Sequence, residues 1–280
     1  MRDQRSFSPG GSYFANQFHM FPIGDDNSGR IRTPFVNYAL LLFNIFVFVY
    51  WQQFGNDIPV TFGYSTVPAE ILTGRDLVSE SRIITDPISG ARQHLPGLQP
   101  GPYPIYLTLL TSMFLHGGIA HIFGNMLYLA VFGDNLENVM GHARYLAFYL
   151  LCGLVASATH VAATAFMGQN PFIPSLGASG AISGVLGGYL LLFPRNRVRV
   201  WFILGFWPFP AFLCVGLWFV FQVINGVGAL GSDEGSGIAY AAHIGGFVAG
   251  LSLVRLFTHA DTYADVLERI EYFKRRRRIF

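Results

Sequence analysis

The chain has 280 residues, of which 52% are hydrophobic, 16% aromatic and only 12% charged. Ordinary soluble domains carry about 25% charged residues, so this composition argues against a soluble globular fold. The net charge of +2 says little about partners, because the basic residues lie in local clusters.

Five uncharged regions are long enough to cross a bilayer core, which needs roughly 20 residues of helix. They are residues 33–56, 93–133, 145–194, 200–232 and 235–254. The third is long enough for two helices, and Pro171 and Pro174 divide it, since proline breaks helices and favours turns. The sequence therefore predicts an all-α membrane protein with six membrane-spanning helices.

The arginines and lysines predict the orientation of these helices. If the six spans alternate, one side receives Arg2, Arg5, Arg30, Arg32, Arg144, Arg195, Arg197, Arg199 and the run 274–278. Short basic segments favour the cytoplasmic side of a membrane. Both termini are therefore predicted to be cytoplasmic. The arginines of the long first loop lie on the other side, but long loops carry little weight in this rule.

The same pattern divides the chain into three parts. Residues 1–32 are polar, without the short apolar core of a signal peptide, and predict a cytoplasmic N-terminal tail. Residues 33–257 form the membrane domain, with a long first loop at about 57–104. Residues 258–280 form a basic cytoplasmic tail whose run 274–278 favours contact with anionic lipid, or alternatively with a protein partner.

Three predicted spans carry unusual polar residues, and such residues inside a membrane helix indicate function. A helix rises about 1.5 Å per residue, which places Ser179 about 24 Å, His121 about 20 Å, His243 about 18 Å and Asn125 about 14 Å from the cytoplasmic charge that bounds each span. In a hydrocarbon core about 30 Å thick, all four share a layer in the outer half.

Small residues at intervals of four surround two of these positions and allow helices to approach closely. They are Gly180 and Gly184 near Ser179, and Ala242, Gly246 and Gly250 near His243; Gly177 is a further small residue just before Ser179. A serine hydroxyl must come within about 2.6–3.2 Å of an imidazole to be activated as a nucleophile. The pattern thus indicates a serine nucleophile with a histidine base. His121 and Asn125, four apart on one helix face, accompany them or form an interhelical polar clamp.

Two other classes of protein remain as alternatives. A metal or haem protein could use His116, His121, His160 and His243, although the His-Glu-x-x-His pattern of zinc proteases is absent. A transporter would show a repeated half or paired discontinuous helices, and neither is evident in the sequence.

The joint motif resembles the rhomboid intramembrane serine proteases over about residues 105–257. It consists of His121-Ile-Phe-Gly-Asn125, then Gly177-Ala-Ser179-Gly180, then Ala242-His243 followed by Gly246 and Gly250. The resemblance implies the six-helix rhomboid-like bundle, with Ser179 as nucleophile and His243 as general base. It also implies that His121, Asn125 and the Ser179 backbone N–H stabilise the oxyanion, and that Glu137 holds a structural acidic position.

The resemblance predicts an endopeptidase that cleaves transmembrane segments near their outer end through an acyl-enzyme. The alternative is an inactive rhomboid-like protein that binds or escorts membrane proteins. Ser183 stands where many members carry an aromatic residue, and no span offers a carboxylate, so we expect packing to orient His243. We expect membrane-protein substrates and lipids as partners, no nucleic acid, no metal or cofactor, and a bacterial inner membrane location.

Overall fold

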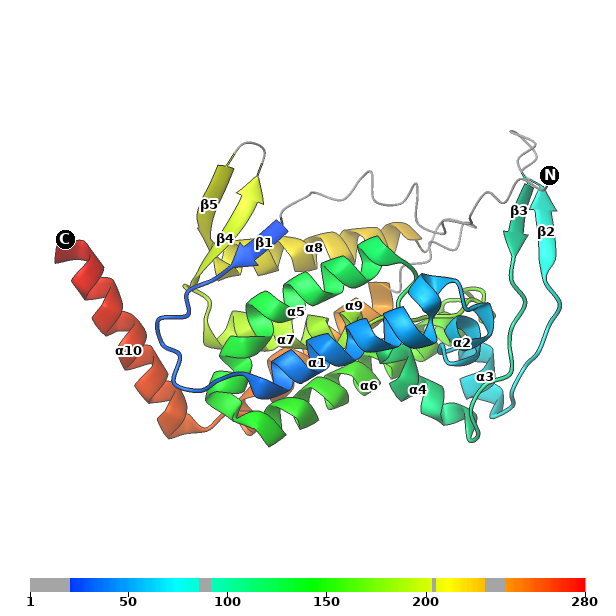
Figure 1. Ribbon diagram of the computed structural model, residues 1–280, viewed down its shortest axis with the longest axis horizontal. Helices are drawn as coiled ribbons and strands as arrows, with labels where there is room; N and C mark the ends of the chain where they lie inside the picture. Colours follow the sequence, from blue (N-terminus) through cyan, green and yellow to red (C-terminus); the bar gives the residue numbers. More distant parts are fainter. Residues whose placement is uncertain (1–20, 86–91, 203–204, 230–239, 280) are drawn as a thin grey trace.

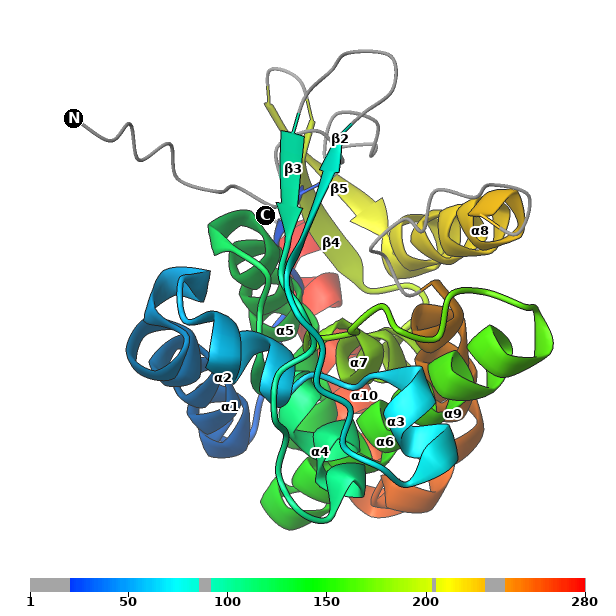
Figure 2. The same ribbon diagram turned by 90° about the vertical axis from the view of Figure 1, so that its right-hand side faces the viewer.

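A bundle of apolar helices forms the body of the protein in a computed structural model that describes residues 21–85, 92–202, 205–229 and 240–279. Its helices are α1 (Phe35–Phe46) with η2 (Val47–Trp51), α5 (Ile119–Met140), α6 (His142–Phe166), α7 (Ser179–Leu192), α8 (Ala211–Ala229) and α9 (Tyr240–Phe257). They lie alongside one another in Figure 1. Figure 2 looks along the bundle and shows α8 at one side of it.

Three described helices are long and apolar enough to cross a membrane, namely α6, α8 up to Gly228, and α9. A fourth span results if Ile105–Phe114 and Ile119–Met140, bent by 78°, are taken together. The segment Phe35–Trp51 and helix α7 are apolar but shorter than 18 residues. The helices therefore support an integral multi-pass membrane protein.

Helix α7 lies at the core of the bundle, and its glycines bring the neighbouring helices very close. A Cβ at Gly246 of α9 would overlap the carbonyl oxygen of Gly180, and one at Gly250 would overlap that of Gly184. Both are backbone atoms, which cannot rotate away as a side chain can. Any larger residue at these positions would push α7 and α9 apart.

The loop between α6 and α7 falls where the two prolines predicted it. Helix α6 ends at Phe166 and α7 begins at Ser179. The described first-loop residues lie at this end of the bundle (Figure 1). They form α2 (Ile58–Gly63), α3 (Pro68–Thr73) and β2 (Arg82–Thr85) paired with β3 (Arg92–Leu95). The short helix η3 (Gln53–Gly55) precedes the loop, and η4 (Ile105–Leu107), α4 (Thr108–Thr111) and η5 (Ser112–Phe114) follow it.

The fifth predicted span began too early in the sequence. Residues 197–202 and 205–210 are not helical but form the paired antiparallel strands β4 (Arg197–Phe202) and β5 (Gly205–Pro210), and α8 begins only at Ala211. The physical reason is visible in the sequence. Basic and apolar residues alternate from Arg197 to Val200, which is the two-residue period of a strand, and the prolines in β5 disfavour a helix there.

The described part of the predicted N-terminal tail, residues 21–32, contacts the β4–β5 hairpin and the helices; residues 1–20 lie outside the described structure. Strand β1 (Phe21–Gly24) pairs with β4 in a three-stranded sheet. Asp25 then accepts hydrogen bonds at 2.6 Å from the Tyr189 hydroxyl and from the Asn135 amide. Arg30 forms an ion pair with Asp134 of α5. Residues 21–32 are therefore fixed to the ends of α5 and α7.

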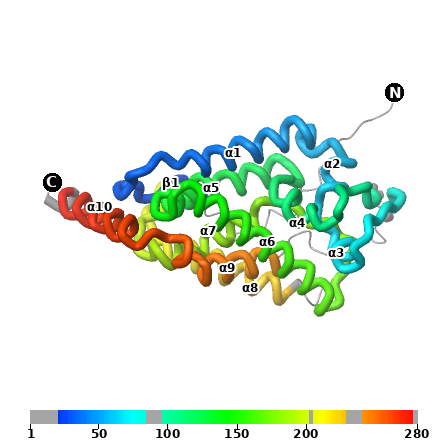
Figure 3. The backbone as a smooth tube through the Cα atoms, turned by 90° about the horizontal axis from the view of Figure 1, so that it is seen from below, coloured from blue at the N-terminus to red at the C-terminus, as the bar shows by residue number. Residues whose placement is uncertain are grey.

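The C-terminal segment is also ordered, as helix α10 (Ala260–Ile279). Its buried Val266 and Ile270 join the hydrophobic core, and both lie against Gly29 of the N-terminal segment. Figure 3 shows α10 extending from the end of the bundle at which β1 also lies. Both segments that flank the predicted membrane domain thus cover one end of it.

Glu137 of α5 is fully buried and holds the start of α1. Its carboxylate accepts hydrogen bonds from the backbone N–H groups of Val36 at 2.9 Å and Asn37 at 2.7 Å. The His142 imidazole lies 2.5 Å from the same carboxylate. Because the first N–H groups of a helix lack partners within the helix, this carboxylate caps α1 from a neighbouring helix.

Candidate active site

The structure brings Ser179 and His243 into direct contact. Ser179 is the first residue of α7, and His243 lies in the first turn of α9. The Ser179 Oγ is 2.7 Å from the His243 Nε2, within the range in which an imidazole can take a hydroxyl proton. Both residues are partly buried.

His121 lies beside this pair. A Cβ built on Gly177 would be 2.9 Å from the His121 Nε2 and 3.7 Å from the Ser179 Oγ, so both atoms border the same glycine. Gly177 has a φ of 127°, a conformation that residues with a side chain rarely adopt. The backbone N–H of Gly117 donates to the His121 Nδ1 at 3.3 Å, which leaves Nε2 on the side of Ser179.

Asn125 is buried one turn further along α5. Its side-chain amide donates a hydrogen bond to the His121 carbonyl oxygen at 3.2 Å. One N–H of the amide is therefore used within the helix, and the second is available for another acceptor. Ser179 has no hydrogen bond to Asn125 in the described structure.

The second nitrogen of the His243 ring has a hydrogen-bond partner that no motif in the sequence predicted. Its Nδ1 lies 2.7 Å from the Oε1 of Gln222 in α8. The ring of Trp218, from the same helix, has its centroid 6.1 Å from that of His243 at an angle of 38°. The expectation that packing alone orients His243 was therefore incomplete, because a neutral amide takes the place of a carboxylate.

The hydroxyl of Ser183 forms a hydrogen bond within its own helix. The residue is fully buried, and this hydroxyl donates to the Ser179 carbonyl oxygen at 2.6 Å. This is a local bond between residues four apart in a helix. The side chain at this position thus faces its own helix, and the aromatic neighbour of His243 comes from α8.

The loop before Ser179 is held by the first loop and by η5. Thr66 and Ser175 exchange backbone hydrogen bonds of 2.9 and 2.8 Å, and the N–H of Gly177 donates to the Ser112 carbonyl at 2.9 Å. The Thr66 and Ser112 hydroxyls are 2.9 Å apart. The long first loop thus contributes to the placement of the serine, which no motif in it indicated.

The other two histidines considered as metal ligands are His116 and His160. His116 is fully buried and its ring centroid lies 5.2 Å from that of His121, whereas His160 lies on α6. Within the described ranges, no three His, Cys, Asp or Glu side chains are grouped as metal ligands.

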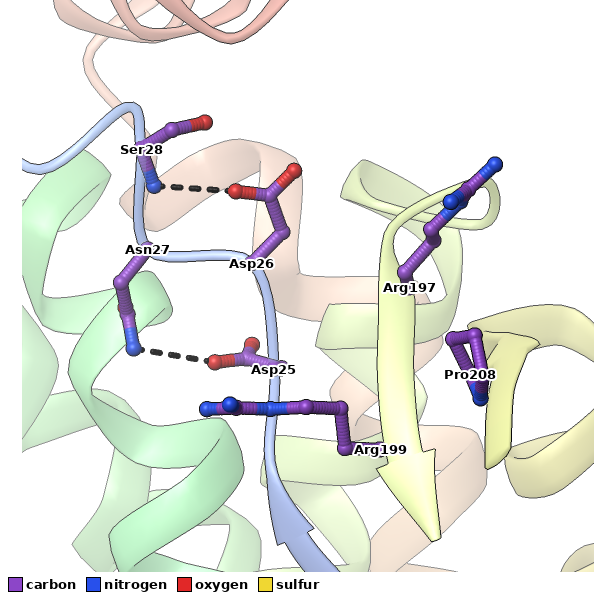
Figure 4. Close-up of a pocket in the computed structure, with 7 residues that line it drawn as sticks. All are labelled: Asp25, Asp26, Asn27, Ser28, Arg197, Arg199 and Pro208. Atoms are coloured by element: carbon purple, nitrogen blue, oxygen red, sulfur yellow. Dashed lines mark hydrogen bonds between the residues drawn. The ribbon is translucent and has the colours of Figure 1, made fainter. Parts of the chain in front are cut away.

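A surface pocket lies at the other end of α7, away from Ser179. It is lined by Asp25, Asp26, Asn27, Ser28, Arg197, Arg199 and Pro208 (Figure 4). Figure 4 shows Asn27 donating to Asp25, and the N–H of Ser28 donating to Asp26. This pocket belongs to the contact between the N-terminal segment and the β4–β5 hairpin.

Comparison with known proteins places this site within a family. The model of the Rhomboid domain matches residues 105–260, which is more than half of the chain. The chain is 34% identical over 162 residues to RHOMBOID-like protein 12, mitochondrial, of Arabidopsis thaliana, covering 53% of this chain and 46% of that protein. It is 32% identical over 151 residues to Rhomboid protein 1, mitochondrial, of Saccharomyces cerevisiae, covering 52% and 40%.

A third relative is bacterial. The rhomboid protease GluP of Bacillus subtilis is 35% identical over 142 residues, covering 51% of this chain and 24% of that protein. The chain thus spans less than half the length of each of these relatives. Two of the three are mitochondrial by name, so they give no support to the expected bacterial inner membrane. The domain match nevertheless shows that this chain belongs to the rhomboid family.

Proposed function

We propose that the protein is an intramembrane serine endopeptidase that cleaves transmembrane segments of membrane proteins through a Ser179–His243 dyad. The observation that carries this proposal is the 2.7 Å approach of the Ser179 Oγ to the His243 Nε2. Membership of a family that includes a named protease, GluP, supports it further.

In the proposed reaction, His243 removes the proton from Ser179 as the oxygen attacks the substrate carbonyl carbon. The imidazolium then returns that proton to the amine that leaves, and an acyl-enzyme forms on Ser179. Water attacks this ester with His243 again as base, which releases the second product and restores the serine.

The developing oxyanion meets donors at the start of α7. The first N–H groups of a helix have no partner within it, and they lie at the positive end of the helix dipole. The Ser179 N–H is one of them, and His121 lies beside Gly177. The second N–H of Asn125 is a further donor. Each such donor contributes about 2.7–4 kcal/mol of transition-state stabilisation in a serine protease.

The proposed topology is six spans, with both termini in the cytoplasm. It counts Phe35–Trp51 and α7 as spans in addition to the longer helices, and both are apolar. The basic residues Arg195, Arg197 and Arg199 follow the end of α7 opposite Ser179. Under the positive-inside rule, Ser179 then lies toward the outer face, so a substrate is cut near its outer end.

The test is cleavage of a single-span substrate by purified protein in liposomes. Ser179→Ala is expected to abolish cleavage, because no other hydroxyl contacts the His243 Nε2 among the described residues. A thermal unfolding midpoint equal to that of the wild type controls for folding. Cleavage by the folded Ser179→Ala protein at the wild-type rate would refute the proposal.

An inactive rhomboid-like protein that binds or escorts membrane proteins is the competing function. A fluorophosphonate probe distinguishes the two without knowledge of the natural substrate. The protease is labelled at Ser179, and labelling disappears in Ser179→Ala. A wild-type protein that cleaves no test substrate and takes no label would favour the binding function.

A further inference from the structure

We propose that Gln222 is a positioning residue that selects the tautomer of His243 and fixes the orientation of its ring. This inference rests on the proposed function, since it assigns His243 the role of base toward Ser179. It adds a third side chain, from α8, to the proposed pair.

The two hydrogen bonds of the ring define the tautomer. The His243 Nδ1 faces the Gln222 Oε1 at 2.7 Å, and Nε2 faces the Ser179 Oγ at 2.7 Å. An amide oxygen can only accept a hydrogen bond, so Nδ1 carries the hydrogen in the neutral ring. Nε2 is then unprotonated and directs its lone pair at the serine hydroxyl, as a general base requires.

The opposite tautomer is disfavoured by the same contact. If Nε2 carried the hydrogen, the lone pair of Nδ1 would face the lone pairs of the Gln222 oxygen at hydrogen-bonding distance. Both groups would lose a partner in a site where Gln222 is buried. A buried polar group without a partner is costly, so the contact favours the tautomer that can act as base.

An amide suits this position better than a carboxylate would. Among the residues that the structure describes, the titratable groups that interact with His243 are His121 and His160, and neither can provide a negative charge. A carboxylate inside an apolar span carries a large desolvation cost, whereas an amide oxygen accepts a hydrogen bond without a net charge. Gln222 therefore orients the ring at lower cost to the fold.

Helix α8 holds the ring in two ways. Trp218 and Gln222 are four residues apart, so they lie on the same face of α8. Trp218 approaches the ring of His243 with centroids 6.1 Å apart, while Gln222 binds its edge. The orientation of His243 on α9 thus depends on a helix that carries neither member of the proposed dyad.

The experiment compares three variants by the rate of cleavage in liposomes. Gln222→Leu removes the acceptor at similar size and is expected to lower kcat about fivefold, as loss of one hydrogen bond of about 1 kcal/mol implies, with little change in KM. Gln222→Glu keeps the acceptor and is expected to retain activity, with the acidic limb of its pH–rate profile at higher pH than in the wild type. Asn225→Leu removes an exposed amide from the same helix and is expected to leave kcat unchanged.

A second measurement does not depend on activity. In protein labelled with ¹⁵N-histidine, the signals of His243 are identified by their loss in His243→Ala. The wild type is expected to show a hydrogen on Nδ1 at neutral pH, and Gln222→Leu a mixture of both tautomers. An Nε2-protonated ring in the wild type, or the same tautomer in both proteins, would overturn the proposal.

These outcomes separate this inference from the proposed function. Gln222→Leu with the kcat of the wild type, or a Gln222→Glu protein as impaired as Gln222→Leu, refutes the role of Gln222 while leaving the dyad intact. Full activity of Ser179→Ala would instead refute the dyad, and the tautomer measurement would still report on Gln222.

Discussion

Replacing Gly246 by alanine tests whether the close approach of α7 and α9 is what brings the proposed dyad together. The new Cβ would lie 3.0 Å from the carbonyl carbon of Gly180, and closer still to its oxygen. Carbon atoms in ordinary contact are about 3.5–4.0 Å apart, so α9 must withdraw by roughly 1 Å. The contacting atoms of Gly180 belong to the backbone, so they cannot rotate away as a side chain can.

This displacement is large compared with the tolerance of the hydrogen bond at the site. Added to the 2.7 Å between the Ser179 Oγ and the His243 Nε2, it takes the pair to about 3.7 Å, beyond the usual range for such a bond. A misplacement of 1 Å can lower an enzymatic rate about 100-fold. Overpacking of this kind also costs about 1–3 kcal/mol of stability.

The assay measures kcat on the liposome substrate together with the thermal unfolding midpoint. Gly216→Ala on α8 is the matched control, because a Cβ there has no atom within 4 Å. We expect the Gly246→Ala protein to remain folded with kcat lowered about 100-fold, and the control to keep the wild-type rate. A Gly246→Ala protein as active as the control would refute the argument from helix spacing.

Two further predictions concern the other end of α7. Burial, assisted by the nearby Asp134 carboxyl, raises the pKa of Asp25 from 3.8 to about 8. Its contribution to the stability of segment 21–32 is therefore complete below about pH 4 and is lost as the pH rises through 8. Asp25→Asn should flatten the pH dependence of hydrogen exchange in that segment, and an unchanged slope would contradict this. Glu137→Gln replaces one acceptor oxygen with a donor opposite a helix N–H and should lower the free energy of unfolding by about 1–3 kcal/mol; an unchanged thermal midpoint would count against it.

The sequence was most informative where polarity and size depart from an apolar background. Ser179 and His243 stand out as polar residues in uncharged stretches, and the structure places them 2.7 Å apart. The glycines at intervals of four lie where α7 and α9 approach most closely. Pro171 and Pro174 lie in the segment that separates α6 from α7. Each of these signals depends only on residues that are close together in the sequence, so it can be recognised from one sequence alone.

The sequence was least informative where structure depends on pairing between distant segments. Strand β1 pairs with β4, although most of the helices of the bundle lie between them in the sequence. Arg30 likewise forms an ion pair with the distant Asp134. A polar segment such as 21–32 has no internal pattern from which such partners could be inferred. The β4–β5 hairpin was a different case. The alternation of basic and apolar residues in β4 was visible in the sequence, but the long uncharged stretch that begins at residue 200 favoured a membrane-spanning helix instead.

Gln222 shows the limit most clearly, because a similar residue lies three positions away on the same helix. Gln222 and Asn225 are both amides within one uncharged stretch, and by polarity alone either could have been a partner of His243. What separates them is the rotation of α8 relative to α9. The structure turns Trp218 and Gln222 toward His243 and leaves Asn225 exposed. That rotation is set by packing between helices, so the residue that orients the base could be identified only once the helices were placed in space.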